Sequence, residues 1–211
     1  VFVDGVYANV DSTGSLNLIL CMVLYSFQIY CDFHGYTTIA IGSAKLFNVN
    51  LSENFKTPYL ASSVTDFWRK WHMTLTTWFR DYIYYPLGGN KGSKIKWAIA
   101  ILTVFIISGV WHGAKWTFII WGVFHAIFVL FEKAAGWDKK SKNKLLQVIK
   151  WGVTFSVVTM LWVFFRSPDM STAFTFFKSI FKNGTMVNDF IGIELIALLI
   201  VFILTDVLTR K

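Results

Sequence analysis

The chain has 211 residues, of which 55% are hydrophobic, 18% aromatic and only 15% charged. Soluble domains carry about 25% charged residues, so this composition excludes an ordinary soluble domain. Several apolar runs approach the roughly 20 residues that cross a bilayer, which predicts an all-α, polytopic helical membrane protein. The net charge of +8 lies in the loops between these runs. It fits the positive-inside rule, and we expect no nucleic acid partner.

The first 47 residues predict a loop followed by an interrupted helix. Residues 1–15 carry two aspartates and no Lys or Arg, so we expect a polar loop outside the cytoplasm. Residues 16–33 predict a helix of about one membrane thickness. Glycine is unfavourable inside helices, so His34 and Gly35 should weaken the helix before it resumes over residues 36–47.

A basic, aromatic segment follows. Between Lys45 and Lys96 there are eight basic and three acidic residues, which indicates the cytoplasmic side. Within it, Thr65–Tyr85 has helical periodicity, with aromatic and aliphatic residues on one side and charges on the other. This pattern predicts an amphipathic helix in the membrane interface, capped by Thr65 and ended by Pro86. The apolar side holds Phe67, Trp68, Trp71, His72, Leu75, Trp78, Phe79, Tyr82 and Ile83.

Two shorter apolar runs flank a turn that contains a histidine. Residues 97–111 and 116–131 would each span only about 22–24 Å as helices. Both outer flanks are basic, so the first arm should start, and the second arm should end, on the cytoplasmic side. We therefore expect a re-entrant or short-armed helical turn that places His112 at membrane depth. Irregular backbone there is tolerated only inside protein or around a watery cavity.

The remaining chain predicts one more surface helix between spans. Residues 133–150 hold six lysines and form the strongest cytoplasmic signal. Residues 151–165 and 189–205 predict further spans, and 173–181 a short amphipathic surface helix. With no repeat or linker, residues 1–211 read as a single membrane domain. The chain begins without methionine or signal peptide, so we expect it to be the C-terminal part of a longer protein.

Histidines are the residues best suited to chemistry. His112 lies between Gly109 and Gly113, and a neutral imidazole there can take a proton from a hydroxyl. An intramembrane ionisable group is by default a functional candidate, although a hydrogen bond across a helix interface is the alternative. His72 is catalytic or part of an aromatic belt, and His34 and His125 are expected to be structural. Their spacings match no metal motif, so no metal site is predicted.

Three motifs resemble the membrane-bound O-acyltransferase (MBOAT) family. They are Asp66–Leu75 (DFWRKWHMTL), Trp78–Asn90 (WFRDYIYYPLGGN) and Gly109–Ala114 (GVWHGA). Residues 28–36, 121–125 and 162–166 also fit, so the resemblance covers nearly the whole chain. It is closest to the alginate O-acetylation branch, of which this would be the C-terminal portion.

The resemblance implies that the protein is an acyltransferase and a multi-pass protein of a bacterial plasma (inner) membrane. An acyl group, expected to be acetyl, would pass from a cytoplasmic thioester such as acetyl-CoA to an exported or cell-surface polysaccharide. The acceptor would be that polysaccharide or an extracytoplasmic acetyl-transfer partner protein, and no cofactor would be bound. His112 would be the general base, and His72 would bind the donor or support the intermediate. Arg69 and Arg80 are the donor-side candidates.

Other functions remain open at this point. Within the enzyme class, D-alanyl or another acyl group could pass to teichoic acid, lipid or protein. Intramembrane histidines and a broken helix also suit a proton-coupled transporter. A non-catalytic scaffold subunit with buried, inert histidines is the third possibility.

Overall fold

The computed structural model describes residues 2–139 and 141–184, and in these residues all regular structure is helical. The long helices are α2 (Ser15–Leu46), α5 (Lys94–His112), α6 (Trp116–Ala135) and α7 (Lys144–Arg166). The short ones are α1 (Phe2–Ala8), η1 (Pro58–Leu60), α3 (Val64–Trp68), α4 (Met73–Phe79), η2 (Arg80–Tyr84) and α8 (Met170–Lys182). All four long helices are long and apolar enough to cross a membrane. The prediction of an all-α, polytopic membrane protein is confirmed.

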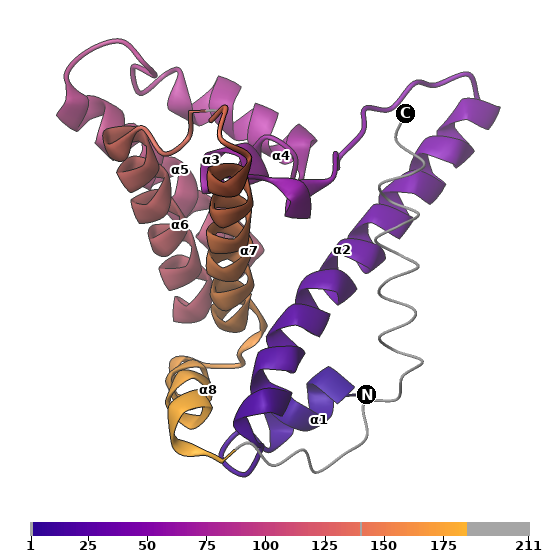
Figure 1. The fold of residues 1–211 in the computed structure, drawn as a ribbon. Coiled ribbons are helices and arrows are strands. Elements are labelled where there is room, and N and C mark those ends of the chain that lie inside the picture. Colours follow the sequence, from indigo (N-terminus) through magenta and orange to yellow (C-terminus); the bar gives the residue numbers. More distant parts are fainter. Residues whose placement is uncertain (1, 140, 185–211) are drawn as a thin grey trace.

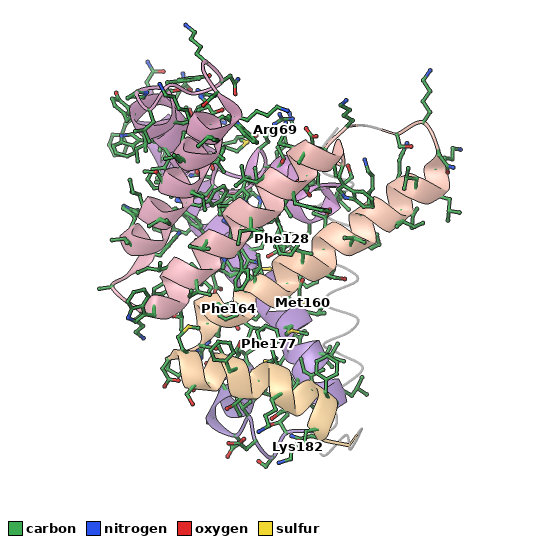
Figure 2. All side chains as sticks on the ribbon, turned by 90° about the vertical axis from the view of Figure 1, so that its left-hand side faces the viewer. Arg69, Phe128, Met160, Phe164, Phe177 and Lys182 are labelled. Carbon is green, nitrogen blue, oxygen red and sulfur yellow. The ribbon has the colours of Figure 1, made fainter. Side chains whose placement is uncertain are left out.

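The long helices run between two ends of the molecule. Figure 1 shows α5, α6 and α7 side by side, with α3, α4 and the α6–α7 connection at one end. Helices α1 and α8 lie at the opposite end, and α2 leans away from α7 as it rises. Figure 2 shows Arg69 toward the first end and Lys182 at the second. Phe164 and Phe177 meet between α7 and α8, with ring centroids 5.4 Å apart.

The N-terminal residues are helical, which corrects the predicted polar loop. Helix α1 buries Val3, Val6 and Tyr7, and the Tyr7 ring stacks on Phe176 of α8 at 5.2 Å. These residues, with Val10, follow the i, i+3, i+4, i+7 spacing of one helix face. That apolar stripe outweighs the two aspartates, one of which, Asp4, pairs with Arg166.

Helix α2 is continuous, although an interruption at His34 was expected. It runs for 32 residues, and Gly35 does not take positive φ. A single helical glycine costs only about 1 kcal/mol, which neighbouring turns can absorb. The His34 ring stacks on Tyr30 one turn earlier, with centroids 5.2 Å apart, so the chain has local packing across the expected break.

The Thr65–Tyr85 segment is divided into three pieces instead of one interfacial helix. Ser63, rather than Thr65, caps α3 by accepting the Asp66 N–H. A turn at residues 69–72 separates α3 from α4, and the chain then continues as the single π-helical turn η2. Trp71 is only 4% exposed and packs against Trp162 of α7, with centroids 5.1 Å apart. The first part of the aromatic stripe thus packs into the protein, whereas Trp78 and Tyr82 are 50% and 67% exposed. Tertiary contacts decide where the helix breaks.

Helices α5 and α6 are longer than the arms predicted from the sequence. At 19 and 20 residues they reach about 28–30 Å, so the argument from short arms does not hold and the depth of His112 remains a prediction. The two helices pack closely at glycines. A methyl group on Gly122 would lie 2.2 Å from the Phe105 carbonyl oxygen, and one on Gly109 would lie 2.5 Å from that of Phe118.

The surface helix predicted over residues 173–181 is confirmed as α8. Asp169 caps it by accepting the Thr172 N–H at 2.8 Å. Ala173 and Phe176 are fully buried on its inner face, whereas Phe181 is exposed. The span predicted at 189–205 lies outside the described residues.

Candidate active site

His72 occupies the turn between α3 and α4 in an unusual backbone conformation. Its φ of 44° and ψ of 52° are left-handed, a region that residues with a Cβ rarely enter. The ring Nδ1 lies 3.1 Å from Oδ1 of Asn54, and Phe33 of α2 packs edge-on against it at 4.7 Å. Burial lowers the pKa of His72 to about 4, so its imidazole is neutral near pH 7.

His112 is the last residue of α5, and the backbone leaves the helix at Gly113. Aromatic rings surround its imidazole on several sides: Trp121 of α6 lies at 5.4 Å and Phe165 of α7 at 5.0 Å between centroids. The part of the chain that the structure describes offers this imidazole no hydrogen-bond partner. A side chain held by ring packing alone has its nitrogens available to a substrate.

The two histidines meet at one tryptophan. The Trp111 ring lies 4.9 Å from His112 and 6.2 Å from His72, between centroids. The fold therefore brings together two histidines that are far apart in the sequence, one from the α3–α4 turn and one from the end of α5.

Arg69 and Arg80 line one cavity of about 220 Å³ between the α3–η2 segment and helices α5 and α6. Its walls are mostly aliphatic and aromatic side chains, and it extends to Ser108, one helical turn before His112. Arg80 is exposed and also binds Asp81 through two hydrogen bonds of 2.8 and 3.2 Å. The cavity thus combines an apolar interior with two cations from one segment.

His125 is fully buried beside this site, with its ring 5.0 Å from that of Trp121 between centroids. Its Nδ1 accepts a hydrogen bond of 3.1 Å from the Trp68 indole N–H. An indole nitrogen can only donate, so the His125 proton is on Nε2. This supports the structural role expected for His125, and His34 likewise packs against Tyr30. Across residues 2–139 and 141–184 no group of three His, Cys, Asp or Glu side chains is placed to hold a metal ion.

Two polar residues that support the site were not found from the sequence. Asn54 contacts His72, and Glu132 of α6 accepts the N–H groups of Val64 and Thr65 at 2.6 and 2.9 Å. Glu132 therefore fixes the start of α3 from another helix. Both contacts are long-range, and a lone Asn or Glu beside apolar residues gives no local pattern that predicts them.

Fold and site together define a helical membrane protein with a two-histidine site beside an apolar cavity. A sequence model described as MBOAT, membrane-bound O-acyltransferase family, matches residues 11–167. The chain therefore belongs to the membrane-bound O-acyltransferase family, as the motifs predicted.

Three curated relatives show which members of the family this chain is similar to in sequence. The probable alginate O-acetylase AlgI of Pseudomonas syringae pv. tomato is 41% identical over 160 residues, which cover 76% of this chain and 30% of that protein. A peptidoglycan O-acetyltransferase of Helicobacter pylori is 40% identical over 172 residues, 80% of this chain and 33% of that protein. A teichoic acid D-alanyltransferase of Bacillus subtilis is 34% identical over 158 residues, 68% and 39% respectively. The chain thus spans about a third of the length of these relatives.

Proposed function

We propose that the intact protein is an O-acetyltransferase of a bacterial plasma (inner) membrane. It moves an acetyl group from a cytoplasmic acyl thioester, such as acetyl-CoA, to hydroxyls of an exported or cell-surface polysaccharide. Delivery is direct or through an extracytoplasmic acetyl-transfer partner protein. The observation that carries this proposal is the meeting of His72 and His112 at Trp111, because acyl transfer to a hydroxyl needs a positioned base.

His112 is the proposed general base. An acceptor hydroxyl attacks the acyl carbonyl carbon while the imidazole takes up its proton. The intermediate then collapses with cleavage of the carbon–sulfur bond, and the imidazolium returns the proton to the departing thiolate. The rings of Trp121 and Phe165 pack against the imidazole and reduce its contact with water, which favours transfer to the acceptor over hydrolysis of the thioester.

The cavity beside α5 is the proposed donor side. Its apolar walls fit a flexible acyl-thioester arm, and Arg69 and Arg80 can bind the phosphates of a nucleotide-type donor by charge-assisted hydrogen bonds. Because the cavity reaches Ser108, an arm that enters at the arginines points along α5 toward His112.

The test is His112→Ala in the intact protein, read out as acetyl content of surface polysaccharide by mass spectrometry. We expect loss of the acetyl groups, because His112 is the group proposed to take the proton of the acceptor hydroxyl. His34→Ala, which removes a histidine outside the proposed site, is the matched control and should leave acetylation near the wild-type level. Normal acetylation in the His112→Ala strain would contradict the proposal.

A second acyl group is supported by one comparison. The Bacillus subtilis relative is named as a teichoic acid D-alanyltransferase, so D-alanyl transfer is the alternative chemistry for the same two histidines. The same mass spectra separate them, because acetyl and D-alanyl esters differ in mass. Family membership counts against a proton-coupled transporter.

A further inference from the structure

The segment around Asn54 holds the His72 turn from the opposite side. The Asn54 carbonyl accepts the Met73 N–H at 2.9 Å, and the Lys56 N–H donates to the Lys70 carbonyl at 3.0 Å. Within this frame, Asn54 Oδ1 lies 2.7 Å from Thr74 Oγ1, 3.4 Å from the Thr74 backbone nitrogen and 3.1 Å from His72 Nδ1. One amide side chain thus contacts both residues that flank Met73.

These contacts determine which way the Asn54 amide points. The Thr74 backbone N–H can only donate, so the Asn54 atom that faces it must be the carbonyl oxygen and not the NH₂ group. The Thr74 hydroxyl is free to donate to the same oxygen. A flipped amide would place NH₂ hydrogens against the Thr74 N–H and lose the bond from that backbone group.

We propose that Asn54 is a positioning residue that keeps His72 in the Nδ1–H tautomer, so that Nε2 presents a lone pair to the substrate. A carbonyl oxygen accepts and cannot donate, so the hydrogen between it and His72 must be on Nδ1. In a neutral imidazole the second nitrogen is then an acceptor. This inference rests on the proposed function for its catalytic meaning, but the tautomer itself is a property of the fold.

The tautomer rules out one of the two tasks expected of His72, support of the intermediate by a donated hydrogen bond. Burial lowers the pKa of this imidazole to about 4, so at neutral pH Nε2 has no hydrogen to donate to an acyl oxygen. His72 instead accepts a hydrogen bond from a hydroxyl of the sugar acceptor and so orients it beside His112. Stabilisation of the tetrahedral oxyanion is left to other donors.

The tautomer is tested by ¹⁵N NMR of histidine-labelled intact protein in detergent, with the His72 signals assigned by their loss in His72→Gln. The wild type should show a protonated Nδ1 and an unprotonated Nε2 at pH 7. Asn54→Leu removes the acceptor but keeps the Met73 backbone bond, so the proton should redistribute between the two nitrogens. Glu53→Leu, which also introduces leucine but at the exposed adjacent residue, should leave the signals unchanged. A wild-type His72 protonated on Nε2 would overturn the inference whether or not Asn54→Leu folds.

The catalytic meaning is tested by thiol release from acetyl-CoA in the presence of cell-surface polysaccharide from the host strain. Loss of one oriented hydrogen bond should raise the apparent KM for polysaccharide in Asn54→Leu by about tenfold, with the apparent KM for acetyl-CoA unchanged. Equal KM values in Asn54→Leu and wild type would overturn the positioning role. If wild-type protein releases no thiol above the His112→Ala level, the proposed function fails while the NMR result still decides the tautomer.

Discussion

At the scale of single residues, the backbone of His72 carries strain that its neighbours offset. A left-handed conformation at a residue with a Cβ costs about 1–2 kcal/mol, and it persists only where surrounding contacts impose it. The Asn54 bonds and the edge-on Phe33 ring supply those contacts. The strain coincides with the residue for which we propose chemistry.

Burial of His72 predicts a specific pH dependence of stability. Its pKa is about 4 in the folded protein and near 6.5 when unfolded. Between these values the unfolded chain binds a proton that the folded chain does not, so this residue makes the protein less stable as the pH falls through that window. We expect the thermal unfolding midpoint in detergent to drop more between pH 7 and pH 5 in wild type than in His72→Gln.

The comparison isolates His72 because the other three histidines are present in both proteins. At pH 7 the two midpoints are the reference, since the imidazole is neutral in both states there. An equal drop in wild type and His72→Gln would show that the His72 imidazole is not desolvated.

At the scale of elements, the contact of α5 with α6 depends on glycine. A methyl group at Gly122 would lie 2.2 Å from the Phe105 carbonyl oxygen. This oxygen belongs to the backbone of the neighbouring helix, so it cannot move aside as a flexible side chain could. Gly122→Ala should therefore force the helices apart and lower the free energy of unfolding by about 1–3 kcal/mol. Acetyl transfer should fall as well, because α5 carries His112. Thermal unfolding and polysaccharide acetyl content measure the two effects.

Gly152 in α7 provides the matched control, because a methyl group there meets nothing within 4 Å. Gly152→Ala should be neutral or stabilise by up to about 1 kcal/mol, since alanine favours a helix over glycine. If both variants were equally stable, the close approach of α5 and α6 would not require glycine.

The sequence predicts a helix correctly where its apolar residues form one continuous run or pack in one direction. Helices α5, α6, α7 and α8 follow apolar runs or stripes, so composition and periodicity suffice to predict them. The prediction of one helix over Thr65–Tyr85 was wrong because the aromatic residues pack against partners on different helices: Trp68 against Trp121 and Trp71 against Trp162. Periodicity shows that these residues are apolar, but not that the helix must end after Trp68 and turn at residues 69–72 for both tryptophans to reach their partners.

The candidate site was predicted in part for the same reason. His72 and His112 stand out within specific motifs, whereas their contact through Trp111 exists only in the fold. Asn54 lies in an irregular segment, where no period exists to assign it a direction. Residues that hold a site together through long-range hydrogen bonds therefore escape sequence reasoning, even when the residues they hold do not.

At the scale of the whole molecule, the second half of α2 carries apolar side chains that the other described residues do not cover. Beyond Phe33 it exposes Tyr36, Ile39 and Leu46 at 70%, 71% and 86%, in the half that leans away from α7 (Figure 1). Lipid or further spans would cover these side chains, and the matched segment makes up only 30% and 33% of two relatives. The two histidines, in contrast, meet entirely within residues described here.

The distribution of charge predicts the orientation of this unit in the membrane. The connection from α6 to α7 is rich in lysine, and it lies at the same end as α3 and α4 (Figure 1). The turn between α1 and α2 lies at the opposite end and has none. By the positive-inside rule the lysine-rich end is cytoplasmic, which places the arginine-lined cavity on the side where an acyl thioester is available.

Single cysteines introduced at Ser12 and Lys142, both exposed, test this in intact cells after Cys21 and Cys31 are replaced by serine. A membrane-impermeant maleimide should label Ser12→Cys in whole cells and Lys142→Cys only after the cells are opened. The reverse pattern would invert the topology, and with it the assignment of Arg69 and Arg80 to the donor side.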